Sequence, residues 1–339
     1  MSTSPSPTVS FVTGSNAQIQ RRIAFSAWFS RLCRCATYFA VVILAVLLGS
    51  VFVSSAKHFH WDFITTPDSA SHDQAGILSG IWGTFWLIFY TGLLSIPLGV
   101  GCAIYLEEFA SDSRLTRFIK INLSNLAGVP SIVYGILGAA VFVKSFEAIK
   151  GKQISIAGGL FRLGLDAPYH NCIITGALTM TLVILPVIII ASQEALRSVP
   201  SSIRAASLAL GATRWQTVRH QVLPAAMPGV ATGVILAISR AIGETAPLIM
   251  VGVITFARFS PGGIESPVQL VTQPHRIADA PFDQYTAMPV EIYNWLRQTP
   301  ADDWYPVAAS GIVVLLAVLL SINSIAAVIR YYAARKIQW

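Results

Sequence analysis

Two charged side chains, Arg240 and Glu244, stand four residues apart in the otherwise uncharged stretch 228–254. A charge inside a membrane span costs about 2.5–3.5 kcal/mol on insertion scales, so such residues are rare and usually functional. The planar guanidinium of Arg240 offers forked donors that match an oxyanion, and the Glu244 carboxylate can accept a hydrogen bond from a protonated anion. The structural alternative is mutual neutralisation on one helix face, although arginine before glutamate is the weaker order for it. The pattern therefore favours a substrate pathway.

The composition indicates what must hold this pair. Of 339 residues, 54% are hydrophobic and only 12% are charged, whereas soluble domains carry about 25% charged residues. Apolar runs of about 20 residues can cross a bilayer core of about 30 Å as helices. We therefore predict an all-α integral membrane protein with six transmembrane helices, and exclude soluble, collagen-like and disordered chains. The predicted spans are residues 36–56, 77–106, 121–143, 171–193, 228–254 and 307–329.

The first span has one alternative reading, a cleaved signal peptide. Ser54, Ser55 and Ala56 resemble a cleavage site. The uncharged run before them is longer than the 7–15 residues typical of a signal peptide, so we predict a retained first helix over 36–56. Residues 1–35 would form an N-terminal tail, mobile over its first 20 residues.

Charge placement predicts the orientation. With the N-terminus inside, the inner segments hold 14 Lys and Arg residues and four acidic residues. The outer segments hold eight Lys and Arg residues and 11 acidic residues. Cytoplasmic segments carry the excess of Lys and Arg, so both the 1–35 tail and the 331–339 C-terminus are predicted to be cytoplasmic. The net charge of +7 then reflects topology, and no nucleic-acid partner is needed. In the outer segment 255–306, the amphipathic piece 289–296 is expected on the membrane surface or against another protein.

The inner segment 194–224 has the pattern of two short helices joined at a glycine. Pro200 and the two serines after it form a helix-start signal with a hydroxyl cap. Gly211 is expected to end the first helix because glycine readily takes the left-handed conformation, and Thr213 can cap the second. Such a rigid knob can receive force from a soluble partner. The expected apolar face of the second helix comprises Trp215, Val218 and Val222.

This segment resembles the "EAA" coupling loop of bacterial ABC-importer permeases, which docks into a groove on the ATP-hydrolysing subunit. Two positions depart from the family pattern: Ala205 replaces its glutamate, and Gln221 replaces its isoleucine. The glycine and the Leu-Pro pair keep their spacing. The resemblance implies an ATPase coupling loop that contains Ala205, Ala206, Ser207, Leu208, Gly211, Leu223 and Pro224.

Three further stretches resemble the phosphate-importing members of that family. Residues 128–135 read Gly-Val-Pro-Ser-Ile-Val-Tyr-Gly, residues 97–108 end in Tyr-Leu-Glu-Glu, and residues 239–247 read Ser-Arg-Ala-Ile-Gly-Glu-Thr-Ala-Pro. The resemblance runs from about residue 76 to the C-terminus. It implies an ABC type-1 permease domain over 76–330 with the type I importer (MetI-like) fold. Tyr134 and Ser131 are further pathway candidates, although helix packing also accounts for their surroundings.

The resemblance also implies a function and partners. The chain would be a permease subunit of an ATP-driven inorganic phosphate importer in a bacterial plasma (inner) membrane. Embedded in membrane lipid, it would share the path with a second phosphate permease subunit and sit on ATP-binding ATPase subunits. It would receive phosphate from an external phosphate-binding protein. The sequence has no G-x-x-x-x-G-K-[ST] loop, so ATP hydrolysis is expected on another chain and this chain is not an enzyme.

No cofactor and no metal site are expected. His58, His60 and Asp62 form an H-x-H-x-D pattern in an outer segment, but no further ligand stands at zinc spacing. The four cysteines also lack ligand or paired spacing and fit apolar packing.

Two other functions stay open at this stage. A proton-coupled secondary anion carrier would use Glu244 as a proton relay and would transport without an ATPase. An ABC permease could alternatively carry another oxyanion, such as sulfate or molybdate. A membrane-embedded enzyme lacks a catalytic cluster in the sequence.

Overall fold

The computed structural model describes residues 16–149, 154–156, 161–163, 171–263, 267–272 and 280–335. The chain divides into two compact units, Met1–Val53 and Ser54–Trp339. The first unit is formed by the long helix α1 (Asn16–Ser55), which includes the predicted span 36–56. This helix begins well inside the segment predicted as a tail, so residues 16–20 are helical rather than irregular; residues 1–15 lie outside the described part.

In the second unit, three continuous helices confirm predicted spans, and a fourth, α10, forms the first part of another. Together with α1 they make five helices in the described residues that are long and apolar enough to cross a membrane, or six if one bent pair counts as a span. Helix α3 ends in η2, a π-helical turn over Tyr105–Phe109. The four helices are α3 (Leu78–Ile104), α7 (Ile173–Arg197), α10 (Leu223–Gly243) and α15 (Ala301–Arg335).

The span predicted over 121–143 forms this bent pair rather than one straight helix. Helix α4 (Arg114–Leu126) and the helical stretch that begins with α5 (Ser131–Gly138) meet at 103°. Pro130 stands at the break as the N-cap of α5, with extended backbone. Proline has no N–H for the preceding turn and disfavours helix at the residue before it, so the two segments form separate helices. After α5 follow η3 (Ala139–Val143) and α6 (Lys144–Ile149).

The span predicted over 228–254 is also interrupted. Helix α10 ends at Gly243, and Glu244 has an extended backbone with φ −79° and ψ 121°. A short helix, α11 (Ala246–Val251), then begins with proline in its first turn and ends at Gly252 with φ 84°. The break lies between Gly243 and Pro247, two residue types that interrupt helices.

The core of the second unit is built where α3, α7 and α10 approach closely. A side chain on Gly99 of α3 would lie 2.6 Å from a methyl of Ile188, and one on Gly233 of α10 would lie 2.4 Å from Cβ of Ala191. Small residues permit such approaches between membrane helices, where dispersion contacts drive association. Fully buried side chains of these three helices include Leu87, Ile173, Met180, Ile184, Ile188 and Ile242.

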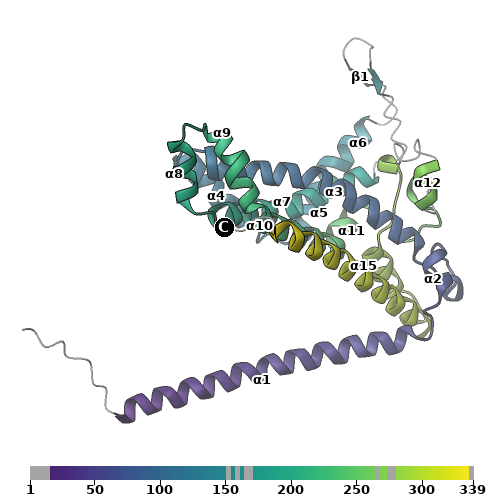
Figure 1. The fold of residues 1–339 in the computed structure, drawn as a ribbon. Helices are drawn as coiled ribbons and strands as arrows, with labels where there is room; N and C mark the ends of the chain where they lie inside the picture. Colours follow the sequence, from purple (N-terminus) through teal and green to yellow (C-terminus); the bar gives the residue numbers. More distant parts are fainter. Residues whose placement is uncertain are drawn as a thin grey trace, which may run out of the picture. The chain divides into compact units, whose positions relative to one another are not determined.

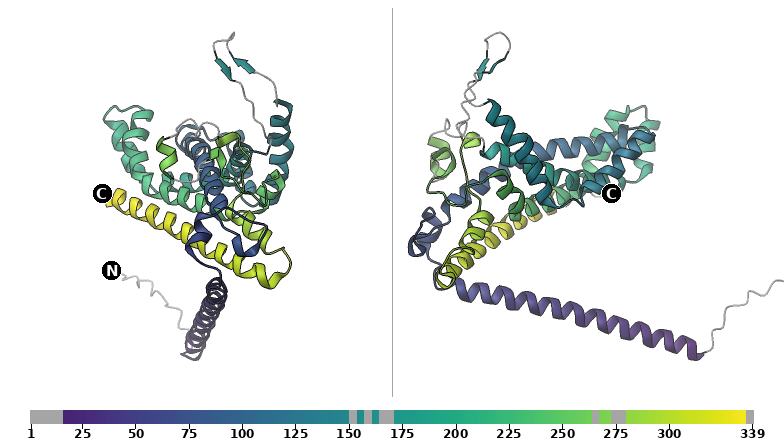
Figure 2. Two further views of the ribbon diagram at one scale, coloured as in Figure 1. Left: turned by 90° about the vertical axis from the view of Figure 1, so that its right-hand side faces the viewer. Right: turned by 180° about the vertical axis from the view of Figure 1, so that it is seen from behind.

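The remaining elements cluster toward the ends of this bundle (Figure 1). Helices α8 (Ser201–Ala209) and α9 (Arg214–Thr217) project at one end, and α2 (Trp61–Thr65) lies at the opposite end. The right-hand view of Figure 2 shows the same separation from behind. Strands β1 (Ile154–Ile156) and β2 (Phe161–Leu163) pair antiparallel, a small exception to the all-α prediction. The short elements are α2 (Trp61–Thr65), η1 (His72–Gln74), α8 (Ser201–Ala209), α9 (Arg214–Thr217), η4 (Val218–Val222), η5 (Pro261–Gly263), α12 (Pro267–Thr272), η6 (Ala280–Phe282) and α14 (Met288–Trp295).

Helix α14 corrects the prediction of a surface helix over 289–296. Val290 and Trp295 are buried, and α14 packs between α3 and α15. Tyr293 remains exposed. The amphipathic pattern was read correctly, but its apolar face packs within this chain rather than on lipid or a partner.

Two carboxyl groups outside the spans are buried beside α14. Asp68 Oδ1 accepts hydrogen bonds from Trp295 Nε1 at 3.0 Å and from the Ser69 amide at 2.9 Å, while Asp68 Oδ2 has no partner. Neither oxygen of the fully buried Glu291 carboxyl has a partner. Burial raises the pKa of Asp68 from 3.8 to about 6, and burial followed by the Asp68 charge raises the pKa of Glu291 well above its usual value.

We expect Asp68→Asn to stabilise the protein at pH 7.5 and to reduce the pH dependence of its stability. Because the folded-state pKa of Asp68 is raised, the folded form binds the proton more tightly, so stability is lost as pH rises through about 6. A shift of about two units corresponds to roughly 3 kcal/mol. Thermal unfolding in detergent between pH 4 and 8 measures this, with the exposed Asp62→Asn as control. A lower Tm for Asp68→Asn at pH 7.5 would contradict the expectation.

Candidate functional site: coupling knob and intramembrane ion pair

The predicted knob forms two helices joined at a glycine. Helix α8 ends at Ala209, Gly211 has φ 84°, and α9 starts at Arg214. Thr213 Oγ1 accepts from the Gln216 amide at 3.2 Å, and Gln216 Oε1 accepts from the Thr213 amide at 2.8 Å. This capping box confirms the predicted cap of the second helix. At the first helix the predicted serine cap is wrong, because Pro200 is the N-cap and no side chain caps it.

The candidate coupling residues fall into exposed and packed groups. Ala205, Ala206 and Leu208 are exposed on α8, and Leu210 is 90% exposed. Ser207 instead faces α9, where its hydroxyl lies 2.9 Å from that of Thr217. The exposed residues form an apolar surface that nothing in the described chain covers. Leu223 and Pro224 form the first turn of α10.

The apolar face predicted for the second helix is partly wrong. Val218 and Val222 are buried, but Trp215 is 57% exposed. The Trp215 ring lies 6.3 Å from the ring of Phe109 at the end of α3. The π-helical turn η4 changes the residue spacing after α9, so a regular 3.6-residue period does not carry Trp215 onto the buried face.

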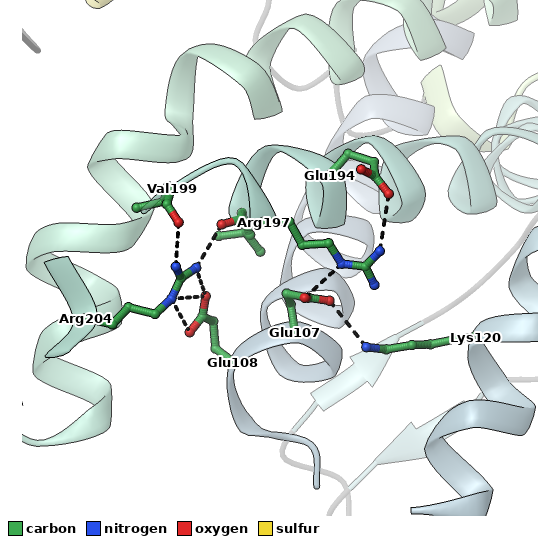
Figure 3. A network of polar contacts seen from close by, with 8 residues as sticks. Glu107, Glu108, Lys120, Glu194, Arg197, Val199 and Arg204 are labelled. Carbon is green, nitrogen blue, oxygen red and sulfur yellow. Dashed lines mark hydrogen bonds and ion pairs between the residues drawn. The ribbon is translucent and has the colours of Figure 1, made fainter. Parts of the chain in front are cut away.

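Behind the knob, a polar network joins the ends of several helices (Figure 3). Glu107 Oε1 accepts from Arg197 Nε at 2.8 Å, and Glu107 Oε2 accepts from Lys120 Nζ at 3.3 Å. Glu108 Oε1 accepts from Arg204 Nη2 at 2.6 Å. Both carboxylates belong to η2, so the end of α3 is tied to α4, α7 and α8. The network borders a cleft of about 570 Å³.

The sequence analysis missed this network. Its signal was the pair of adjacent acids, Glu107 and Glu108, that directly follow a long uncharged span. Arg204 stands one residue before the motif position Ala205 and drew no separate interpretation. The pairing becomes visible only when the fold brings residues 90 to 96 positions apart together.

The charged pair occupies the break after α10. Arg240 Nε donates to Glu244 Oε1 at 3.0 Å, with 44% and 17% of the two side chains exposed. The sequence placed both residues on one continuous helix, whereas Glu244 follows the last helical residue. The contact is the mutual neutralisation that the sequence analysis gave as the structural alternative, although the helix that was to carry it ends between the two residues.

A neighbouring contact sets the depth of the pair in the bundle. Ser239 hydrogen bonds to Asn323 of α15, which lies in the uncharged stretch 307–329. At 1.5 Å per residue, Asn323 is about 33 Å along α15 from Ala301. Arg330, seven residues further along α15, donates to the Thr232 hydroxyl at 3.1 Å. Ser239, the residue before Arg240, therefore packs on the uncharged part of α15 rather than at its charged end.

The two interrupted spans meet beside this pair. Gly135 of α5 packs on α11 so closely that a Cβ there would lie 2.6 Å from Cα of Pro247. Tyr134 is buried, donates through its hydroxyl to the Leu126 carbonyl at 2.8 Å, and interacts electrostatically with Arg240. Ser131 is partly buried at the start of α5. The motifs around residues 128–135 and 239–247 thus form one junction.

The remaining chemical candidates are the H-x-H-x-D segment and the four cysteines. Among the described residues, no group of three His, Cys, Asp or Glu side chains is placed to hold a metal ion. His58 and His60 contact each other edge to face at 5.1 Å between ring centroids. Cys172 is buried, and Cys102 is partly buried, in agreement with packing roles for these two; Cys33 and Cys35 are exposed on α1.

Comparison with known proteins places these features in a family. Residues 95–338 match the family described as "Binding-protein-dependent transport system inner membrane component". The chain is 32% identical over 292 residues to the probable ABC transporter permease protein YqgI of Bacillus subtilis, covering 84% of this chain and 88% of that protein. It is 31% identical over 306 residues to the phosphate transport system permease protein PstA 1 of Mycobacterium tuberculosis, covering 87% and 86%.

A solved structure supports the fold. A chain of a bacterial alginate ABC transporter, crystallised with its periplasmic protein, superposes with a TM-score of 0.56 at 14% identity, covering 91% of this chain and 94% of that one. The predicted type I ABC importer permease fold is therefore confirmed. The family match, the relatives and the apolar helices together show that this chain belongs to the binding-protein-dependent transport system inner membrane components, as a multi-pass permease subunit of the PstA type.

Proposed function

We propose that this chain is the permease subunit of an ATP-driven inorganic phosphate importer. The observation that carries the proposal is the Arg240–Glu244 pair at the break of α10, one residue past the contact of Ser239 with α15 and next to Tyr134. A charged pair at this depth is costly unless it serves transport. The similarity to named phosphate permeases supports phosphate as the anion.

The pair suits phosphate as a transient contact. The Arg240 guanidinium, 44% exposed, offers forked donors to an oxyanion. Near neutral pH phosphate carries at least one proton, which the acceptor-only carboxylate of Glu244 can bind, whereas sulfate carries none. Interrupted helices also let backbone groups face a path. Tyr134 and Ser131 would border this path from α5.

The knob would dock on the ATPase. Ala205, Ala206 and Leu208 form its exposed apolar surface. Because Ala205 stands in place of the family glutamate, docking here would depend on shape more than on a charge pair. We propose PstB-like ATPase subunits at this surface, a PstC-like second permease beside this chain, and a PstS-like phosphate-binding protein on the outer side. Both termini would be cytoplasmic, as the positive-inside distribution predicts.

The rival functions differ in what they require. A proton-coupled carrier would use Glu244 as a relay and would need no exposed knob. A sulfate or molybdate permease would keep the knob and the Arg240 fork but would gain nothing from the acceptor-only Glu244.

Reconstitution separates the importer from the carrier. The chain alone in liposomes, with an imposed proton gradient, is expected to take up no phosphate. The complex purified with its co-purifying subunits, identified by mass spectrometry, is expected to take up phosphate only with ATP. Gradient-driven uptake by the chain alone would reject the importer proposal.

A further inference from the structure

We infer that Arg204 and Glu108 are positioning residues that carry movement of the coupling helix α8 into the transmembrane helix α3. The inference rests on the proposed function, because it assumes that an ATPase moves α8. Neither residue belongs to the exposed docking surface, and neither lies near Arg240. The two side chains come from segments 96 positions apart and meet where η2 ends α3.

Arg204 forms a three-way junction. Its Nε donates to both oxygens of Glu108, at 3.2 and 3.3 Å, and its Nη2 donates to Oε1 at 2.6 Å. Its Nη1 donates to the Val199 carbonyl at 2.7 Å, and Nη2 also donates to the Leu196 carbonyl at 2.8 Å. Figure 3 shows the guanidinium between the Glu108 carboxylate and the Val199 carbonyl. One planar group thus binds α8, η2 and the end of α7 together.

The chemistry of this junction requires arginine. The Leu196 carbonyl lies in the last turn of α7 and the Val199 carbonyl just beyond its end, where the helix dipole favours a cation. A guanidinium can serve the carboxylate and both carbonyls at once because its donors are fixed in one plane. A lysine ammonium would keep the charge but lose the bidentate contact to Glu108.

Burial makes the link stiff. Glu108 is 9% exposed and Arg204 is 24% exposed, whereas typical surface ion pairs contribute little because water and mobility weaken them. Removing one partner of a largely buried pair leaves the other unsatisfied, so the pair resists separation. Displacement of α8 would therefore pull on Glu108 rather than stretch the bonds to it.

The Arg204–Glu108 pair links the knob to α3, a helix that is not its neighbour along the chain. The backbone joins α8 to α7 through residues 198–200 and to α10 through α9, and the Ser207–Thr217 contact supports the second connection. Helix α3 is remote in sequence, and the Arg204–Glu108 pair supplies side-chain hydrogen bonds from α8 to its end. Because α3 packs along α7 through the bundle, movement at η2 would reach the transmembrane core.

Glu107 provides a contrast within the same turn. It binds Arg197 and Lys120, and so holds α3 to α7 and α4 without touching α8. Glu194 pairs with Arg197 at 3.3 Å but is 67% exposed. It is the matched acid for a control, because it belongs to the same network without linking α8 to α3.

The test measures phosphate transported per ATP hydrolysed by the whole complex in proteoliposomes. The wild-type complex must first show ATP-dependent phosphate uptake. If it does not, the result rejects the proposed function rather than the role of the Arg204–Glu108 pair. For Glu108→Gln we expect uptake per ATP to fall at least ten-fold, with the ATPase subunits still bound and ATP hydrolysis no longer stimulated by the loaded binding protein. Arg204→Lys should be intermediate, and Glu194→Gln should match wild type.

Two results would overturn the inference. Coupling within two-fold of wild type in Glu108→Gln would show that the pair transmits nothing. Loss of the ATPase subunits from both Glu108→Gln and Arg204→Lys would make the pair a support for docking instead. A merely structural pair would not give a complex that keeps its ATPase subunits but whose ATP hydrolysis is no longer stimulated by the loaded binding protein.

Discussion

Arg240→Ala is expected to reduce ATP-driven phosphate uptake to background in a complex that still contains its ATPase subunits. The substitution removes the forked donors and leaves Glu244, only 17% exposed, without its partner at 3.0 Å. The unpaired carboxylate left behind would repel an anion. Uptake of labelled phosphate into proteoliposomes measures the effect, normalised to complex recovered after purification.

Conservative variants separate a path residue from a structural ion pair. Arg240→Lys keeps the charge but loses the fork, so partial uptake is expected. Glu244→Gln should assemble normally but discriminate less between phosphate and sulfate, because an amide can also donate to sulfate. Normal uptake by Arg240→Ala would reduce the pair to a structural contact, and the path assignment would be withdrawn.

Gly211→Val is expected to lower ATP-driven uptake at least ten-fold. Gly211 has φ 84°, and a β-branched residue rarely adopts this left-handed backbone. Nothing lies within 4 Å of a Cβ built there, so the cost comes from the backbone and not from a clash. The turn between α8 and α9 would change, and the docking surface would be misdirected.

Gly211→Asn is the matched control, because asparagine tolerates the left-handed conformation. It adds a side chain of similar size in the same open space, and uptake close to wild type is expected. If Gly211→Val transports as well as Gly211→Asn, the shape of this turn does not matter for coupling. The ATPase activity of each purified complex shows whether hydrolysis persists without transport.

Much of the architecture follows from sequence periodicity and composition. Uncharged runs located α3, α7, α10 and α15, because the length that crosses a bilayer is fixed by helix geometry. The two breaks were harder to predict. Pro130 and Pro247 each permit either a kink or a complete interruption, and the choice depends on what packs there. Here α5 and α11, which follow the two breaks, pack closely where Gly135 approaches Pro247.

The candidate site was predictable to a similar extent. Gly211 and Thr213 define the knob through local backbone rules, which need no tertiary information. The Arg204–Glu108 pair could not be read in the same way, because sequence gives charges without giving their partners. Asp68 is a similar case: its carboxyl is ordinary in sequence, but in the fold it is buried and bound by Trp295 of α14.

The most direct test of the phosphate importer is the initial rate of labelled phosphate uptake by the complete complex in proteoliposomes. The binding protein is added outside and ATP is trapped on the side of the ATPase subunits. The account predicts ATP-dependent uptake that excess sulfate or molybdate does not reduce. Uptake that is independent of ATP, or that excess sulfate or molybdate abolishes, would contradict it.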